Sequence, residues 1–336
     1  LLGNSPKNIL ANYYMLTGKT LMPPKYALGL GHVGNFLTTL WQPGEAKERN
    51  AVMFEDGNYY TRTNKPEDAS GKGSLNGEEE YQFSARAMVD RYQKQHFKLS
   101  WIVPNYDVQE INEEAMASFS EYAAIHDVSA GLWSQNNTPK ASPDTTFIQT
   151  DTTDPKVLKN DALILRNNLK RKRPLIFSNT GIAGSQNRTM LAFGDIGGNW
   201  ENIPTQVAGF LGASLSGQPL VGSAVDGTAG GGNAQIAIRD FEWKAFTPIL
   251  FNLDDQGKFS KTPFAYNSKM AQINRAYLKL REQLQTYLYT LIYRAQVGEP
   301  ILRPVCLVFP HEPVNYTPQV GHDVLWGPRW LMSPIG

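Results

Sequence analysis

The sequence predicts an α/β fold, a (β/α)8 TIM barrel with a long insertion after strand one and the start of a C-terminal β-domain. Between residues 26 and 255, eight short runs of apolar and β-branched residues alternate with segments of helical periodicity. Buried parallel strands have this composition, and eight strand–helix units in roughly 250 residues match such a barrel in size. Most of the runs end in a polar, small or acidic residue. Active sites of these barrels lie at the carboxyl ends of the strands, so we look for function there.

The eight runs give the order of the expected strands. They are residues 26–32, 98–105, 127–134, 145–151, 173–180, 188–195, 218–227 and 247–255. Residues 41–80 contain few apolar positions and predict a long loop after the first strand. Helical spacing predicts outer helices within 78–95, 113–126, 154–172 and 202–215, and a longer one within 268–297.

The ends of the chain differ from its middle. Residues 1–25 predict a lead-in with a short helical stretch, and residues 26–300 predict the catalytic barrel. Residues 301–336 predict the start of a β-rich module, truncated here, with strands within 301–310 and 322–335. The chain opens without methionine, so we interpret it as part of a longer protein whose other domains are expected partners.

Composition excludes several classes of function. The chain has 336 residues with 32 basic and 31 acidic side chains, so nothing indicates a nucleic-acid partner. No run of 18 apolar residues exists, so no membrane span is expected. The single Cys306 leaves the compartment open, with a secreted or cell-surface bacterial location favoured over a cytoplasmic one. The five histidines lack metal-ligand spacing, so we expect no metal.

Two aspartates end predicted strands in settings that suit sugar chemistry. Asp151 ends the fourth strand and Asp195 ends the sixth. A retaining glycosidase needs two carboxyl groups about 5 Å apart, one as nucleophile and one as proton donor. We expect these two to lie roughly 5–7 Å apart at the barrel mouth. Asp154 precedes Pro155, which also suits a simple helix cap.

A glycine pattern on the first strand points to a different class of function. Gly29, Gly31 and Gly34 match the spacing of a dinucleotide-binding loop. A polar run containing Trp41 and Pro43 follows, where such a site needs a helix and then a second strand ending in an acid. We therefore expect no nucleotide cofactor.

A series of motifs runs through the chain in a recognisable order: LTGK at 16–19, PPKYALG at 23–29, IAGSQ at 182–186, LSGQPLVG at 215–222 and LWGP at 325–328. The series resembles glycoside hydrolase family 31, the retaining α-glycosidases and α-transglycosidases. The resemblance implies that Asp151 is the nucleophile and Asp195 the general acid/base. Asp154 falls on the acidic residue that follows the family's nucleophile.

The same resemblance marks departures at positions that usually bind glucose. Gln149 replaces a tryptophan, Val103 an aspartate, Asn179 an arginine and Leu253 a histidine. Other segments are similar to the family branch that acts on α-linked N-acetylgalactosamine. The expected substrate-binding residues are Trp101, Asn105, Gln149, Asp154, Asn179, Trp200, Asp226, Arg239, Trp243 and Asp254, and Trp133 is a further candidate aromatic.

The sequence thus predicts a retaining exo-α-glycoside hydrolase acting on oligosaccharides or glycans, with N-acetylgalactosamine or galactose as the sugar. The alternative is an α-glucosidase or α-glucosyltransferase acting on α-glucans. A third reading is a barrel that binds glycans without cleaving them. The two-carboxylate mechanism requires no cofactor.

Overall fold

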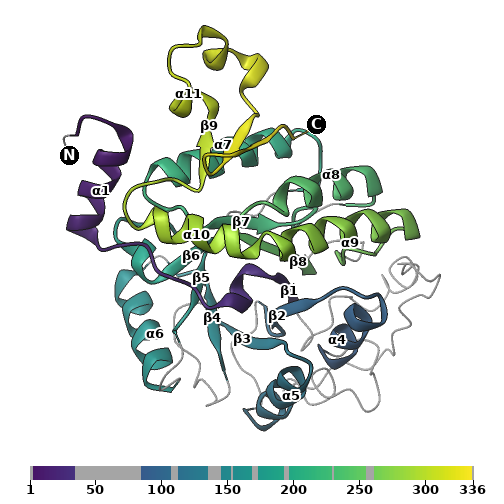
Figure 1. Ribbon diagram of the computed structural model, residues 1–336. Coiled ribbons are helices and arrows are strands. Elements are labelled where there is room, and N and C mark those ends of the chain that lie inside the picture. The colour runs from purple at the N-terminus through teal and green to yellow at the C-terminus, as the bar shows by residue number, and fades with distance from the viewer. Residues whose placement is uncertain are drawn as a thin grey trace.

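The computed structural model describes residues 3–34, 85–106, 113–134, 145–152, 154–168, 173–192, 197–228, 231–254 and 261–334. In this part of the chain eight parallel strands close into one barrel, in sequential order around the ring (Figure 1). They are β1 (Leu30–Gly34), β2 (Leu99–Val103), β3 (Ser129–Ser134), β4 (Phe147–Thr150), β5 (Ile176–Ser178), β6 (Thr189–Ala192), β7 (Val221–Ala224) and β8 (Ile249–Asp254). Strand β1 pairs with both β2 and β8. The predicted fold class is therefore confirmed.

Helices cover the outside of the barrel. They are α4 (Ala85–Lys94), α5 (Glu113–Ile125), α6 (Pro155–Asn168), α7 (Asn202–Leu215), α8 (Ala234–Lys244), α9 (Ser268–Gln283) and α10 (Gln285–Ala295). Side chains cap several of them; for example, Asn233 accepts hydrogen bonds from the first turn of α8, and Asn267 accepts one from the backbone N–H of Met270 in α9. Only the short 3-10 turn η3 (Ser185–Asn187) lies between β5 and β6. None of these helices is long and apolar enough to cross a membrane.

Three local details differ from the expectation. The first run begins with the 3-10 turn η1 (Lys25–Leu28) rather than with strand. The long helical pattern splits at Leu284, whose φ of −89° and ψ of 2° end α9 and start α10. The apolar residues after Pro304 form helix α11 (Val305–Val308) instead of strand. Proline lacks the N–H that would continue a ladder, and its fixed φ suits the start of a helix.

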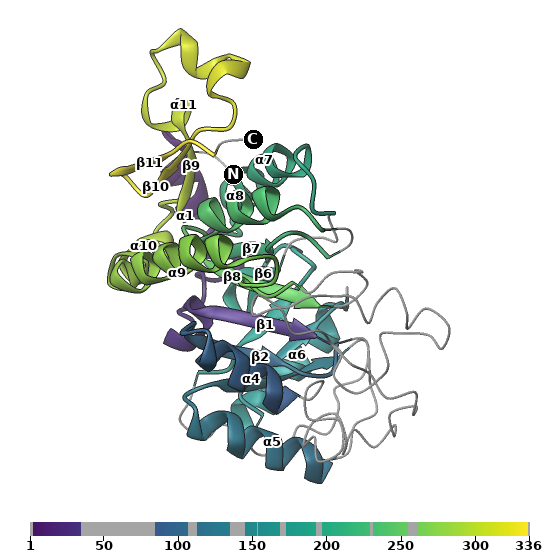
Figure 2. The same cartoon turned by 90° about the vertical axis from the view of Figure 1, so that its right-hand side faces the viewer.

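The lead-in helix α1 (Pro6–Thr17) and a small sheet lie outside the barrel (Figure 2). The sheet has the antiparallel order β11 (Trp330–Met332), β10 (Val324–Trp326), β9 (Leu302–Pro304). The 3-10 turns η4 (Pro313–Tyr316) and η5 (Pro318–Val320) join β9 to β10. Glu299 ties these parts together, because its carboxylate contacts Lys7 of α1, Arg294 of α10 and Arg303 of β9.

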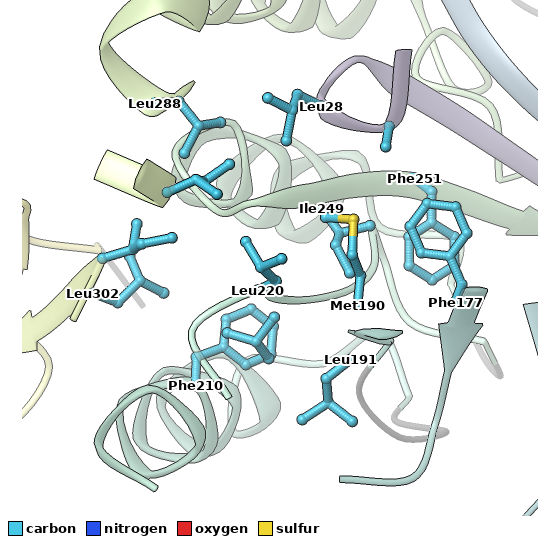
Figure 3. Packing of buried hydrophobic residues seen from close by; sticks show 14 of the residues in the cluster. Leu28, Phe177, Met190, Leu191, Phe210, Leu220, Ile249, Phe251, Leu288 and Leu302 are labelled. Carbon is cyan, nitrogen blue, oxygen red and sulfur yellow. The ribbon is translucent and has the colours of Figure 1, made fainter. Parts of the chain in front are cut away.

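Aromatic rings fill the barrel interior. Trp101 stacks on Phe177 with ring centroids 4.6 Å apart and meets Phe147 edge-on at 5.6 Å. Phe251 lies with Phe177 in the same layer (Figure 3). Gly31 makes room for the indole, because a Cβ there would lie 2.0 Å from the ring of Trp101. Gly31 therefore serves the packing of the barrel interior, in agreement with its prediction as strand.

Candidate active site

Asp151 lies at the mouth of the barrel, directly after β4. Its side chain is half-buried, and the indole Nε1 of Trp133 on the neighbouring strand β3 donates a hydrogen bond to Oδ2 at 3.0 Å. Trp133 is itself only 2% exposed. A hydrogen bond to an ionised carboxylate is stronger than a neutral one and fixes its orientation. The carboxylate of Asp151 is therefore held in place by a rigid neighbour.

Trp133 is held in turn by Asn105. The amide of Asn105 accepts a hydrogen bond from the backbone N–H of Trp133 at 2.8 Å and donates to its carbonyl at 3.2 Å. Asn105 is fully buried, two residues beyond the end of β2, so it continues the pairing of β2 with β3 through its side chain. Tyr106 packs against the indole with ring centroids 5.9 Å apart. Asn105 thus supports the indole that contacts Asp151.

Gln149 lies two residues before Asp151, in register with Trp133. It is 6% exposed, and its Oε1 has no hydrogen-bond partner among the described residues. Alternate residues of a strand share a face, so Gln149 points to the same side of the sheet as Asp151. Val103 and Leu253, the apolar departures at the ends of β2 and β8, are also buried. The floor of the mouth thus combines apolar side chains with one amide.

The rim of the mouth carries three more of the expected residues. Asp154 caps α6, because its Oδ1 accepts a hydrogen bond from the N–H of Lys156 at 2.8 Å. Asn179 follows β5 and is exposed, and Trp200 is half-buried before α7. Asp195 lies outside the described residues.

Asp226 follows β7 and is 3% exposed. Its Oδ2 accepts hydrogen bonds from Lys261 Nζ at 3.1 Å and from the hydroxyl of Tyr266 at 2.8 Å. Its backbone N–H donates to Asp240 on α8, which pairs with Lys244 at 2.6 Å. Burial raises the pKa of Asp226, and the charge of Lys261 opposes this shift. We call these five residues the β7 anchor.

Asp254, the last residue of β8, also has partners within the fold. Its Oδ1 accepts a hydrogen bond from the backbone N–H of Lys261 at 2.6 Å, and its Oδ2 lies 3.4 Å from Nε2 of His32 on β1. The other ring nitrogen of His32 lies 2.9 Å from the hydroxyl of Tyr92 on α4. The carboxylates of Asp226 and Asp254 therefore both bind Lys261, which lies in the described segment before α9, and sugar binding by either stays a prediction.

Three of the expected binding residues have other contacts within the fold, and sugar binding by them stays a prediction. Trp101 packs inside the barrel among aromatic rings and is 1% exposed. Trp243 lies buried on α8, where its indole donates to Asp240. Arg239 lies on α8 rather than at a strand end and pairs with Glu242 at 2.7 Å. Both residues therefore belong to helix α8 and not to a strand end.

Lys261 and Tyr266 are the polar residues at the strand ends that sequence reasoning missed. Both lie in the segment between β8 and α9, which has no periodic pattern. Composition was the one signal in the sequence that could have identified Lys261, because a lysine in a loop near strand-end aspartates suggests an ion pair. The alternative of a solvated surface lysine could be excluded only from the burial of Lys261, which is 2% exposed.

The part of the chain from β4 to α10 matches known proteins in sequence. Residues 146–291 match the family profile described as "Glycosyl hydrolases family 31 TIM-barrel domain". Lysosomal alpha-glucosidase of Mus musculus is 32% identical over 164 residues, which is 48% of this chain and 17% of that protein. Intestinal sucrase-isomaltase of Homo sapiens is 32% identical over 167 residues, 49% of this chain and 9% of that protein. The chain thus spans less than a fifth of the length of these two relatives.

Solved structures match over almost the whole chain. A family 31 alpha-glucosidase from Bacteroides thetaiotaomicron superposes with a TM-score of 0.73 at 16% identity, covering 99% of this chain and 63% of that one. A dextranase from Flavobacterium johnsoniae superposes with a TM-score of 0.72 at 16% identity, covering 100% of this chain and 49% of that one. These likenesses establish the fold. Over residues 146–291 the chain is similar in sequence to the TIM-barrel domain of glycoside hydrolase family 31.

Proposed function

We propose that this chain is the catalytic barrel of a retaining α-glycosidase. The observation that carries the proposal is the carboxylate of Asp151, fixed at the barrel mouth by the indole of Trp133 at 3.0 Å. A nucleophilic carboxylate must be aimed and held still, and the hydrogen bond from the indole does both. The similarity of residues 146–291 to the family's TIM-barrel domain supports the same role.

The proposed reaction has two displacements. Asp151 attacks the anomeric carbon while Asp195 protonates the leaving oxygen, so the glycosidic bond breaks and a covalent glycosyl-enzyme forms. Asp195, now a carboxylate, removes a proton from water, whose oxygen displaces Asp151. When a sugar hydroxyl replaces the water, the product is a transferred glycoside. The residues assigned here need no metal or organic cofactor for either step.

α-Glucosides are the substrates that the comparisons support best. Similar proteins are named lysosomal alpha-glucosidase, sucrase-isomaltase and dextranase. This favours the glucan-acting alternative over the reading of the sequence in terms of N-acetylgalactosamine. We therefore propose an α-linked glucose at the cleavage site as the first candidate.

A specific observation keeps α-N-acetylgalactosaminides as the second candidate. Gln149 offers a buried amide whose Oε1 has no partner among the described residues, and Val103 and Leu253 offer no hydrogen bond. Buried sugar hydroxyls need matched partners, so losing several of them changes which sugar fits. An amide beside apolar surface suits an N-acetyl group, which is itself an amide with a methyl group.

Initial rates on the 4-nitrophenyl derivatives of α-glucose, α-galactose and α-N-acetylgalactosamine test both the activity and the sugar. The assay needs the full-length protein and its Asp151→Asn variant as control. Turnover of the glucoside that the variant loses is the expected result. Preference for the galactosaminide would select the second candidate. Binding of an α-glycoside without any turnover would contradict the catalytic proposal and favour a glycan-binding barrel.

A further inference from the structure

The β7 anchor is buried, charge-balanced and unusually well connected. Its four ionisable members other than Tyr266 are two aspartates and two lysines, each at most 3% exposed. Besides the contacts already given, Lys261 Nζ donates to the carbonyl of Asp226 at 2.8 Å, and Lys244 Nζ donates to the carbonyl of Ala224 at 2.6 Å. The anchor therefore fixes the backbone at the end of β7 from two sides.

The backbone of Asp226 is correspondingly special. Its φ is 61°, a conformation uncommon for a residue with a side chain. Gly231 also has a positive φ, 104°, and a Cβ there would lie 2.7 Å from Lys261 Nζ. The N–H of Gly232 donates to the hydroxyl of Tyr266 at 2.7 Å. The end of β7 is thus held in one strained shape by its buried partners.

This fixed backbone supports the segment that follows Asp195. Gly197 forms an isolated antiparallel bridge with Gly227, the residue after Asp226. Gly198 packs directly on the anchor, because a Cβ there would lie 2.3 Å from Oδ1 and 2.4 Å from the carbonyl oxygen of Asp226. The carbonyl of Gly197 also accepts a hydrogen bond from the side chain of Asn202 on α7 at 2.6 Å. The anchor therefore sets the position of Gly197 and Gly198.

We propose that Asp226 and Lys261 are positioning residues for Asp195. This inference rests on the proposed function, in which Asp195 is the general acid/base. Only Ile196 lies between Asp195 and Gly197 in the chain, so covalent geometry keeps the Cα atoms of Asp195 and Gly197 within roughly 7 Å of each other. What fixes Gly197 therefore limits where the carboxyl group of Asp195 can lie. A shift of about 1 Å in a catalytic group can cost roughly 100-fold in rate.

The test measures how kcat/KM depends on the acidity of the leaving phenol in a series of aryl α-glycosides. The glycosides of this series carry glucose, unless the initial rates on the nitrophenyl derivatives select N-acetylgalactosamine. A nitrophenolate leaves without proton donation, whereas a plain phenol leaves poorly without it. Misplacing the proton donor should therefore slow the phenyl glycoside more than the nitrophenyl glycoside. A general loss of structure would slow both equally.

Two variants perturb the anchor at different strengths. The double variant Asp226→Asn/Lys261→Met removes both charges together, because a single change would leave one charge buried and unpaired. Tyr266→Phe keeps all charges and removes only the hydroxyl that bonds Asp226 and Gly232. Ser223→Ala is the matched control, because Ser223 lies on β7 and this change removes its buried 2.6 Å hydrogen bond to Gln206 of α7.

The expected result is a fall of roughly 100-fold or more for the phenyl glycoside, and of less than about tenfold for the nitrophenyl glycoside, in the double variant. Tyr266→Phe should show the same pattern more weakly, and Ser223→Ala should show none. If the double variant does not fold, the result for Tyr266→Phe decides whether the inference holds. An equal fall across the series, or no change, would overturn the inference. Absence of turnover by the wild type on every glycoside would instead contradict the proposed function.

Discussion

The contact between Trp133 and Asp151 is the feature at the residue scale on which the proposed chemistry depends. The indole belongs to β3 and the carboxylate follows β4, so two adjacent strands bring them together. A donor on a buried, rigid ring cannot follow the carboxylate if it moves. The hydrogen bond therefore selects one orientation of Asp151 before substrate binds.

Trp133→Phe should slow the reaction by roughly 10- to 150-fold, because a hydrogen bond to a charged group is worth about 1.5–3 kcal/mol. The ring volume is largely kept, so KM should change less than kcat. Trp326→Phe is the control, since its indole is equally buried in the small sheet. Steady-state kinetics on the preferred nitrophenyl glycoside check this, and equal effects of the two variants would contradict it.

Single residues divide into those the sequence could assign and those it could not. Asp151 and Asp154 follow a strand and precede a helix, so their positions at the mouth and at a helix cap were predictable. The partners of Asp226 were not, because Lys261 and Tyr266 lie 35 and 40 positions away in sequence and meet it only when the barrel closes. Arg239 and Trp243 were misplaced because helix α8 was not recognised.

At the scale of elements, Arg281 on α9 closes the amino-terminal end of the barrel. Its guanidinium donates to the carbonyls of Leu28, Ala245, Thr247 and Pro248 at 2.6–3.0 Å. These carbonyls come from the turns before β1 and β8. Burial lowers the pKa of Arg281 to about 9, and none of these contacts is with an acid. One side chain thus ties α9 to the entry of two strands.

Arg281→Met should lower the free energy of unfolding by about 3 kcal/mol or more, because each buried carbonyl left without a donor costs about 1–3 kcal/mol. Chemical denaturation measures this. Arg275→Met is the matched control, since Arg275 lies on the same helix and donates to a single carbonyl, that of Gln95. Equal destabilisation by the two changes would contradict the role given to Arg281.

Glu299 links α1, α10 and β9, and this link should depend on pH. Burial acts to raise its pKa, but the hydrogen bond from Lys7 and the charges of Arg294 and Arg303 outweigh burial and lower it. A carboxyl group with a lowered pKa in the folded state stabilises the fold above its unfolded pKa, about 4.3. This contribution is lost as the pH falls through the folded value.

Thermal unfolding of the wild type should therefore move to lower temperature as the pH drops below about 4.3, and Glu299→Gln should reduce this dependence. The melting temperature across pH 3–6, measured for both proteins, provides the test. Asp323→Asn is a control at an exposed carboxylate of the small-sheet region. An identical pH dependence in wild type and Glu299→Gln would contradict the assignment.

Elements were predictable where one pattern dominated. The eight strands follow from apolar runs because both faces of a parallel strand are buried. The break between α9 and α10 at Leu284 was not predictable, because residues 268–297 keep helical spacing on both sides of it. Helix α11 was misread as strand because a four-residue apolar run has no periodicity that distinguishes the two.

At the scale of the whole molecule, barrel closure creates the site. Strands β3 and β4 supply the indole and the carboxylate. Asp226 after β7, two residues of α8 and two residues before α9 make the β7 anchor. Sequential parallel order brings all carboxyl ends to one side, so groups far apart in sequence share one mouth. The sequence predicted this arrangement through the number and spacing of its strands. It could not predict which strand-end groups would pair with one another.

The central claim is that Asp151 is the nucleophile of a retaining double displacement, and azide rescue tests it most directly. Asp151→Ala should lower turnover of the preferred nitrophenyl α-glycoside by several orders of magnitude, on the order of 10⁴-fold or more. Azide can then enter the space of the missing carboxylate and attack from the same face. Proton NMR of the product should show a β-configured glycosyl azide and partial recovery of rate. Near-normal activity without any azide adduct would contradict the assignment of Asp151.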